Sequence, residues 1–174
     1  MKRFIGIVTL IVIIALAGQS ARAQTFKFGH INSDELIQAL PEFDSAQIKL
    51  ENFRKELVNA LELMSVELNN KSDKYNKESK TLTDIVKQTK EQELTDMQRR
   101  IQEFQSNAQQ QLQDKQAELF QPIYIKVDKA IKDVGKENGY FYIFNATQGG
   151  SLLYVDEEKS TNVTQLVKAK LKIK

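Results

Sequence analysis

The sequence predicts an α+β chain in which a long antiparallel coiled-coil hairpin of helices projects from a small β-body. Three observations carry this prediction. None of the seven glycines lies between His30 and Val134, and that interval of about a hundred residues holds only two prolines, so turn formers are scarce. Apolar residues within it recur at spacings of three and four, which is the pattern of a coiled-coil seam. Strand-like runs rich in aromatic residues flank it on both sides.

The composition argues against an enzyme. Hydrophobic residues make up 41% and charged residues 28%, which is too apolar for a disordered chain and typical of long amphipathic helices. The absence of cysteine removes disulfides, thiolate metal sites and a cysteine nucleophile, and the single histidine, His30, cannot form a ligand cluster. The carboxylates do not converge on one place. We therefore expect no catalytic, metal or cofactor site, and we expect His30 to be a strand residue with a satisfied ring.

Residues 1–23 have the form of a cleavable signal peptide. Lys2 and Arg3 precede an apolar run from Phe4 to Ala17, and Ala21-Arg22-Ala23 matches the small-x-small site of signal peptidase. An uncleaved membrane anchor is the alternative, but a run of about 14 residues is shorter than the roughly 20 that a span needs. Cleavage after Ala23 predicts an exported, periplasmic protein.

Cleavage also changes the charge balance. Lys2, Arg3 and Arg22 leave without an acidic residue, so the formal net charge falls from +2 to −1. A slightly negative mature chain gives no electrostatic support to nucleic-acid binding. Nucleic acid is therefore not expected as a partner.

The mature chain begins with a short strand and a short helix. Thr25 to Ile31 alternates in the manner of a strand. Asn32 or Ser33 can cap a brief helix, which Pro41 is expected to end.

Residues 44–119 are expected to form the hairpin arm. Asp44 is a plausible N-cap, with Gln47 in the capping-box position. The turn at the tip is expected near 81–84, in a polar stretch rich in Lys and Thr. A single uninterrupted helix is the alternative, because no glycine forces a turn. The apolar seam positions are Leu50, Phe53, Leu57, Leu61, Met64, Leu68, Tyr75 and Leu82 before the turn, and Leu94, Met97, Ile101, Phe104, Ala108, Leu112, Leu119, Ile123, Val127, Ala130 and Val134 after it.

A narrow seam leaves other apolar residues of the arm outside it. Val58, Leu63, Val66 and Ile85 fall off the seam, so the arm is expected to expose some apolar surface. Pro122 falls inside the returning helix, where it removes one amide donor, and a bend is expected where arm meets body.

The chain changes character after Val134. Gly135 and Asn138-Gly139 are expected to end the helix. Tyr140–Phe144 and Ser151–Val155 read as two strands, and Asn162 can cap a final helix.

Residues 24–43 and 120–174 together make up the expected β-body. About three strands per chain bury little area and leave open edges, which is marginal for a monomer. Closing several copies into a shared barrel would remove those edges. We therefore expect self-association through the body.

The order of these segments resembles the Skp/OmpH-like family of periplasmic chaperones. The resemblance covers essentially the whole mature chain, and its most telling part is the run LFQPIYIKVDKAIKDVGKENGYFYIF from Leu119 to Phe144, followed by SLLYV and the helix headed by Asn162-Val163-Thr164. The family often has Asp-Ile-Thr at that last position, and the capping chemistry survives the change. The resemblance implies a jellyfish-like homotrimer with a small barrel, whose arms enclose unfolded outer-membrane proteins without ATP.

Three groups of residues are the candidate functional surfaces. The apolar arm residues expected to bind client are Leu63, Met64, Val66, Met97, Ile101 and Phe104. The basic tip consists of Lys71, Lys74, Lys77, Lys80, Lys87 and Lys90. The expected trimer contacts in the body are Phe26, Phe28, Tyr140, Tyr142, Phe144, Leu152 and Tyr154.

Two of these groups have a simpler structural explanation as well. Coiled-coil packing alone would account for the arm residues, and a solvated helix surface would account for the lysines. The basic tip is a candidate contact for anionic lipid, lipopolysaccharide or acidic client segments, with an affinity that falls as salt rises.

The resemblance thus implies an ATP-independent holdase that binds unfolded outer-membrane proteins in the periplasm. The alternative is a structural or adaptor coiled-coil protein of the cell envelope, in which the arms bridge two partners.

Overall fold

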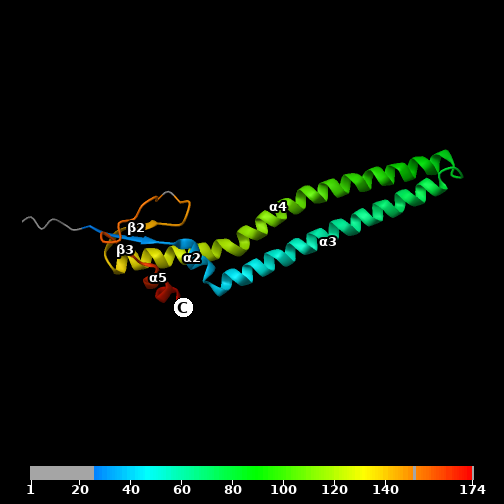
Figure 1. Ribbon diagram of the computed structural model, residues 1–174. Coiled ribbons are helices and arrows are strands. Elements are labelled where there is room, and N and C mark those ends of the chain that lie inside the picture. The colour runs from blue at the N-terminus through cyan, green and yellow to red at the C-terminus, as the bar shows by residue number, and fades with distance from the viewer. Residues whose placement is uncertain (1–25, 151, 174) are drawn as a thin grey trace, which may run out of the picture.

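The computed structural model describes residues 26–150 and 152–173, and shows a small body from which one long hairpin projects (Figure 1). The predicted α+β class is confirmed at this level, since most described residues are helical and one small sheet is present. The elements are β1 (Lys27–Ile31), α2 (Ser33–Gln38), α3 (Pro41–Glu78), α4 (Asp84–Glu137), β2 (Tyr140–Asn145), β3 (Ser160–Asn162) and α5 (Thr164–Leu171). The predicted signal peptide, residues 1–23, lies outside the described residues.

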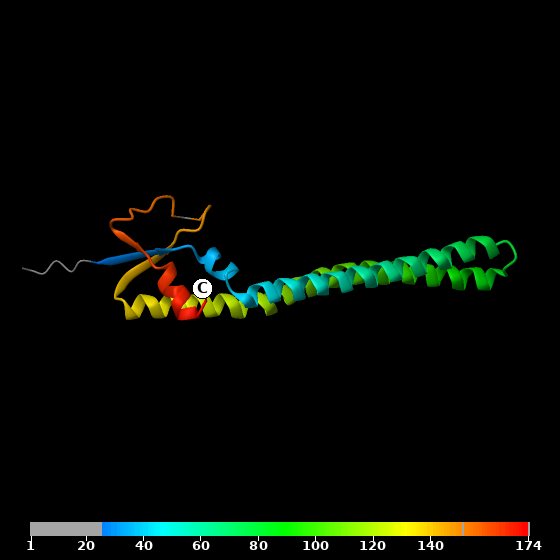
Figure 2. The same cartoon turned by 60° about the horizontal axis from the view of Figure 1, so that its bottom comes forward.

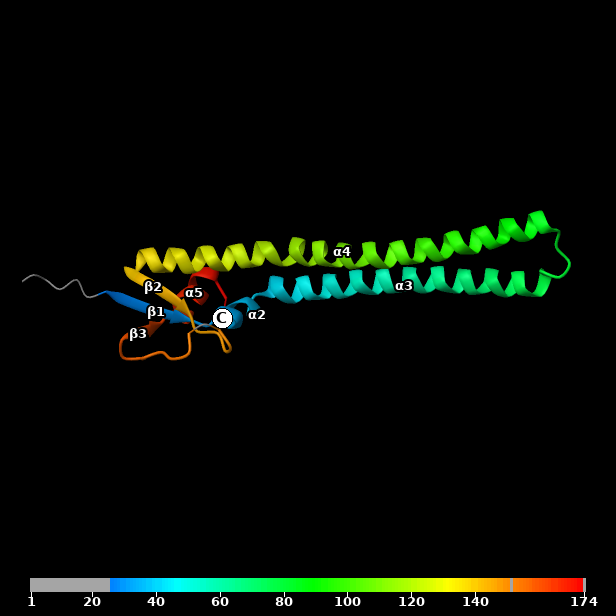
Figure 3. The ribbon, with the colours of Figure 1, turned by 90° about the horizontal axis from the view of Figure 1, so that it is seen from above.

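Helices α3 and α4 pack side by side in opposite directions to form the arm (Figure 3). They contain 38 and 54 residues. At 1.5 Å per residue these helices are about 57 and 81 Å long. The last part of α4 continues past the start of α3, and the other elements of the body pack against it. The arm is therefore built from two separate helices, not from one uninterrupted helix.

The turn between the arm helices spans residues 79–83 and contains no glycine. The backbone N–H of Thr81 donates to the carbonyl of Glu78 at 2.9 Å, and the Thr81 hydroxyl donates to the same carbonyl at 2.8 Å. The Ser79 hydroxyl donates to the carbonyl of Asn76. Hydroxyl side chains thus satisfy carbonyls at the end of α3, which lets the chain turn without a left-handed glycine.

The start of α3 differs from the prediction. Pro41 does not end the short helix: α2 ends at Gln38, and Pro41 occupies the first turn of α3 after Leu40 as N-cap. Asp44 lies inside α3 and is not its N-cap. The reason is that a proline at the first helical position loses no hydrogen bond, and its fixed φ suits the start of a helix.

The predicted caps of the two short helices are close to those observed. The Asn32 side chain accepts from the backbone N–H groups of Asp34 and Glu35, so Asn32 caps α2. At α5 the Asn162 side chain accepts from the N–H of Thr164 at 3.0 Å, although the N-cap position itself belongs to Val163.

The sheet has the order β2-β1-β3, and both pairings are parallel. The prediction of a strand at Ser151–Val155 is wrong for its described part, since residues 152–155 have no regular structure; Ser151 lies outside the described residues. The third strand is Ser160–Asn162 instead. Because parallel strands need a crossover connection, residues 146–150 and 152–159 run back along the sheet before β3 can begin (Figure 2).

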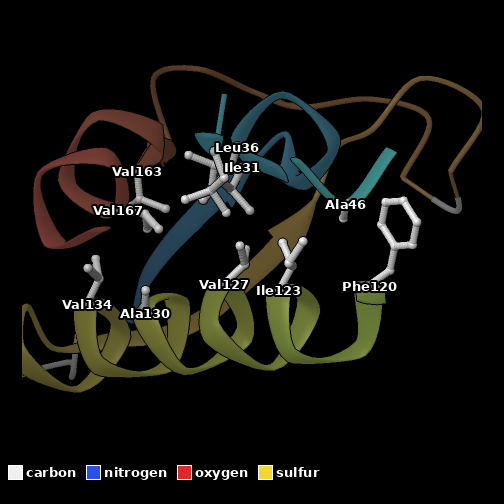
Figure 4. Packing of buried hydrophobic residues seen from close by; sticks show 11 residues of the cluster. Ile31, Leu36, Ala46, Phe120, Ile123, Val127, Ala130, Val134, Val163 and Val167 are labelled. Carbon is white, nitrogen blue, oxygen red and sulfur yellow. The ribbon is translucent and has the colours of Figure 1, made fainter. Parts of the chain in front are cut away.

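The core lies between the sheet, α2, α5 and the body end of α4 (Figure 4). On α4, Ile123, Val127, Ala130 and Val134 are all buried, at the spacing of one helix face. Leu36 of α2 points into the centre of this cluster (Figure 4). The cluster consists of Ile31, Leu36, Leu40, Ala46, Phe120, Ile123, Val127, Ala130, Val134, Val163 and Val167.

Two glycines lie at positions where a residue with a side chain would be crowded or strained. A Cβ at Gly29 would lie 3.1 Å from Cγ1 of Val163 and 3.2 Å from Cγ1 of Ile143, so β1 can approach the core closely only with glycine here. Gly139 follows α4 with a φ of 68°, the left-handed conformation common after a helix end.

Helix α4 bends where the arm leaves the body (Figure 1). Pro122 lies inside α4 near this point, which agrees with the predicted bend. Across the junction, Nζ of Lys126 on α4 lies 2.5 Å from Oε1 of Glu42 on α3. This ion pair joins the N-terminal end of α3 to the part of α4 that lies in the body.

The ion pair gives a first testable prediction. The hydrogen bond from Lys126 is the main cause that holds the pKa of Glu42 below its ordinary value, with a backbone hydrogen bond in second place. A lowered pKa in the folded state means that the stabilisation exists above the unfolded-state pKa and is lost as pH falls through the folded-state pKa. We expect Lys126→Met to raise the Glu42 midpoint in an NMR titration of side-chain carboxyls. Both groups are half-exposed, so the effect on global stability should be small and should shrink with salt. Identical midpoints in the two proteins would contradict the pairing.

Candidate functional site

The arm exposes aliphatic side chains on its surface. Leu63 is 71% exposed, and Val66 is exposed as well. Val58, which precedes Leu63 by more than one helical turn on α3, is also exposed. A seam between only two helices buries one stripe of each helix, so these residues have no partner helix to cover them. The arm therefore carries sparse apolar contacts on an otherwise polar surface.

The six predicted client-binding residues fall into three classes of exposure. Leu63 and Val66 are exposed, whereas Met64, Ile101 and Phe104 are half-buried in the seam. Met97 is only 6% exposed. Met97 thus serves the packing of the two arm helices, and a partner would reach it only if the helices separated.

Charged pairs along single helices keep the rest of the arm polar. Glu51–Lys55, Glu67–Lys71 and Lys115–Glu118 are pairs of this kind, three or four residues apart. Each such pair adds only a few tenths of a kcal/mol to helix stability. Their larger effect is to keep an arm with exposed aliphatic groups soluble.

An apolar hollow of about 620 Å³ lies at the base of the arm on α4. Its apolar lining comes from Ala117, Phe120, Tyr124 and Ile125. Three glutamines and Asp128 surround this lining. Amide groups can donate and accept, so the rim can satisfy the polar backbone of an extended chain while the floor contacts its apolar side chains.

The outer face of the sheet is aromatic and largely uncovered. Phe26 and Phe141 lie with ring centroids 4.5 Å apart, and Phe28 stacks with Tyr142 at 6.5 Å. Phe144 continues the cluster at 5.8 Å from Tyr142. This aromatic face (Phe26, Phe28, Phe141, Tyr142 and Phe144) lies on the side of the sheet opposite the core. An exposed patch of this kind on a small body marks an interaction surface.

The predicted trimer residues do not all lie on that face. Tyr140 packs against the core, with the Lys27 ammonium 4.1 Å from its ring centroid. Tyr154 is exposed and Leu152 is half-buried, and both line a small hollow next to Phe28 and Phe144.

Two exposed residues of the body lie outside the predicted set of trimer contacts. Leu153 is 95% exposed in the crossover connection. Phe141 is exposed because the pairing shifts by one residue between Lys27 and Phe28, which face Tyr140 and Tyr142, so that Phe141 is the extra residue of a bulge. Strict alternation along β2 would have placed it on the other face.

The basic tip surrounds the turn at the far end of the arm. Lys71, Lys74, Lys77 and Lys80 are exposed, while Lys87 and Lys90 are half-buried. Near them the Tyr75 hydroxyl donates to Oε1 of Glu91 and so joins α3 to α4. This hydrogen bond raises the pKa of Tyr75.

His30, the single histidine of the chain, has a polar partner in the described part of the structure. The buried His30 ring has Ser160 as a partner, with Nδ1 and Oγ 3.0 Å apart, as expected for a satisfied strand residue. Among residues 26–150 and 152–173, no three acidic or histidine side chains gather closely enough to hold a metal ion. The same residues include no helix with the length and apolarity needed to span a bilayer.

Comparison with known families identifies the chain. Residues 27–171 match the family model described as outer membrane protein (OmpH-like). A comparison with curated proteins gives no match. The matched segment includes the whole arm and nearly all of the body. The chain therefore belongs to the OmpH-like family, a family of periplasmic chaperones for outer-membrane proteins and not of enzymes.

Proposed function

We propose that this chain is an ATP-independent periplasmic holdase that keeps unfolded outer-membrane proteins from aggregating. It is exported with residues 1–23 as a signal peptide, which is cleaved after Ala23, and it works as a homotrimer whose arms surround the client. Family membership supports the kind of client and the compartment. The geometry of the arm supports the mode of binding.

One observation carries the proposal: the arm presents aliphatic groups to solvent along a polar helical pair. Leu63 and Val66 are exposed on α3, and the hollow lined by Phe120 and Tyr124 opens at the arm base. A holdase needs many weak apolar contacts, because tight burial of any one client segment would prevent release. Scattered aliphatic side chains at distances set by a rigid helix meet that requirement.

The aromatic face supports assembly of several copies. Four of its five rings are exposed although they are large and apolar, and Phe28 is half-buried. Both β2 and β3 have an unpaired edge in the described sheet. Further copies of the chain that cover this face and pair with these strand edges would bury the exposed rings and satisfy the unpaired backbone groups. Arms that project from the same side of such an assembly would then enclose a space.

A test of the holdase function uses aggregation of a urea-denatured outer-membrane barrel protein on dilution. We expect the mature chain to suppress light scattering at a stoichiometric amount without ATP. The double variant Leu63→Ser/Val66→Ser should need about tenfold more protein, because each lost aliphatic contact costs on the order of 1 kcal/mol.

The matched control for that test is Leu166→Ser, which also removes an exposed leucine but lies on α5 of the body. It should suppress aggregation as the parent protein does. A well-folded assembly that leaves the denatured barrel protein to aggregate would rule out the holdase and favour an adaptor coiled coil.

A further inference from the structure

The part of α4 that enters the body has two apolar faces. One face packs into the core through residues such as Ile123 and Val127 (Figure 4). On the other face Tyr124 is 48% exposed and Ile125 is 59% exposed. Phe120 is buried, and its ring stacks on the Tyr124 ring with 6.4 Å between centroids. The second face therefore offers apolar surface that the fold of a single chain does not use.

The apolar hollow on this second face continues toward the sheet. Another hollow of about 330 Å³ lies between α2, α4 and β2, and Tyr124 and Asp128 line both hollows. Together the two form one groove, which we call the arm-base groove. Its lining on α4 extends from Gln113 to Ile131. At 1.5 Å per residue this stretch of helix is about 27 Å long.

The length of the arm-base groove matches a particular kind of segment. An extended chain advances about 3.4 Å per residue, so about eight residues span the groove. A transmembrane β-strand has roughly 9–11 residues, alternates apolar and polar side chains, and carries aromatic residues near the membrane interfaces. One unfolded strand of an outer-membrane protein therefore has the length of the groove and an apolar side to place in it.

The polar groups of the arm-base groove suit an uncharged extended chain. Gln113, Gln116 and Gln121 are exposed along one hollow, so their amides can donate to and accept from the backbone of a bound chain. Among the described residues that line the groove, only Asp128 is charged, and its Oδ2 lies 2.6 Å from Nζ of Lys132. The groove is thus close to neutral, and binding in it should depend little on salt.

These observations point to one occupant. We propose that the arm-base groove binds one unfolded transmembrane strand of the client, with an aromatic side chain of that strand in the hollow beside Tyr124. The proposal rests on the holdase function and names the part of the client that is recognised. Aromatic rings attract one another in stacked and edge-to-face arrangements, and the Phe120–Tyr124 pair offers a partner for such a ring. A hollow of about 620 Å³ falls in the size range of sites that enclose ligand groups.

The position of the arm-base groove favours a client over a second copy of the chain. Ile143 lines the groove and packs against the core, whereas its neighbours Tyr142 and Phe144 belong to the aromatic face. The groove and the aromatic face therefore lie on opposite sides of the sheet. Assembly through the aromatic face leaves the groove open.

A peptide that imitates one transmembrane strand tests the proposal with the mature protein. The probe has about ten residues that alternate between polar and apolar, is uncharged, and carries one tryptophan among its apolar positions. Because the chain contains no tryptophan, the fluorescence reports on the peptide alone. We expect a blue-shifted emission and a raised anisotropy on binding, with little change as salt rises. An otherwise identical peptide with leucine in place of the tryptophan should compete about fivefold less well.

Two variants of the groove keep the core intact. Tyr124→Gln/Ile125→Gln removes exposed apolar groups and should weaken peptide binding about tenfold. Ala117→Phe adds a ring to the lining at an exposed position and should weaken binding by filling the hollow. The matched control is Ile48→Gln, which also removes an exposed isoleucine but lies on α3 outside the groove. It should bind the peptide as the parent does.

Three outcomes would overturn the proposal. The first is unchanged peptide binding by Tyr124→Gln/Ile125→Gln. The second is equal competition by the leucine peptide, which would remove the preference for an aromatic side chain. The third is dissociation of the assembly of this variant in sedimentation velocity, which would make the groove a contact between copies.

The aggregation assay separates this proposal from the holdase function on which it rests. A parent protein that suppresses aggregation of the denatured barrel protein but does not bind the peptide would contradict the groove as the strand site and leave the holdase intact. A parent protein that fails in the aggregation assay would contradict the holdase itself. We expect the parent to succeed in both assays and Tyr124→Gln/Ile125→Gln to be weaker in both.

Discussion

Replacing Tyr142 by Asp is expected to convert the assembled protein into monomers. Tyr142 is 54% exposed at the centre of the aromatic face, between Phe28 and Phe144. In the proposed trimer a neighbouring copy covers this face, so the substitution would bury an unpaired carboxylate in each contact. Such a group costs several kcal/mol, and the loss of the buried ring adds roughly 1.5–3 kcal/mol. The dissociation constant should therefore rise by about three orders of magnitude or more.

Sedimentation velocity over a range of concentrations measures this effect. The control is Ile48→Asp, which also places a carboxylate at an exposed aliphatic position but lies on α3, away from the sheet. That variant should sediment with the parent, and both variants should keep the parent's far-ultraviolet circular dichroism. A Tyr142→Asp protein that sediments like the parent would show that the aromatic face is not the subunit contact.

Replacing Leu36 by Ala should destabilise the body more than any surface change of the same kind. The Leu36 side chain is fully buried, and α2 packs there against both α4 and α5. Truncating a buried leucine removes its contacts and leaves a cavity, at a typical cost of about 2–5 kcal/mol. Small domains are stable by only about 5–15 kcal/mol, so this change removes a large share.

Urea unfolding followed by circular dichroism tests the effect. Leu63→Ala provides the control, because it makes the same substitution at a position that is mostly exposed. We expect a change within about 0.5 kcal/mol for that variant. Equal midpoints for the two variants would mean that Leu36 does not lie in the core of the folded protein in solution.

Local patterns were sufficient to predict the arm and the first two strands. The spacing of seam residues such as Leu57, Leu61 and Met64 repeats over many turns, which makes a helix the simplest solution. The turn was harder to place, because Ser79 and Thr81 terminate α3 through hydroxyl hydrogen bonds that leave no glycine or proline in the sequence.

The body was predicted less well because its contacts are distant in sequence. Residues 152–155 are apolar or aromatic and so resemble a strand, yet they belong to the crossover that a parallel sheet requires. Strand β3, Ser160–Asn162, is short and polar, so the sequence has no alternation of apolar and polar residues that would predict it. It is held by pairing with β1, about 130 residues earlier, as the His30–Ser160 contact shows. Pro41 was misread because a proline can either end one helix or begin the next.

The candidate surfaces were predictable as regions but not residue by residue. The off-seam positions Leu63 and Val66 are exposed, as the helix pattern predicted. Met97 is buried, as its seam position predicts, and Tyr140 packs against the core, because burial depends on the partner helix or sheet and not on residue type. The exposure of Phe141 follows from a bulge that no local pattern indicates.

In the proposed mode of action, several copies of this chain hold one unfolded client between their arms. Native mass spectrometry of the mature protein, mixed with a urea-denatured outer-membrane barrel protein and diluted without ATP, tests it most directly. We expect a dominant species with the mass of three chains and one client. An assembly that stays free of client while the barrel protein is recovered only in aggregates would contradict it.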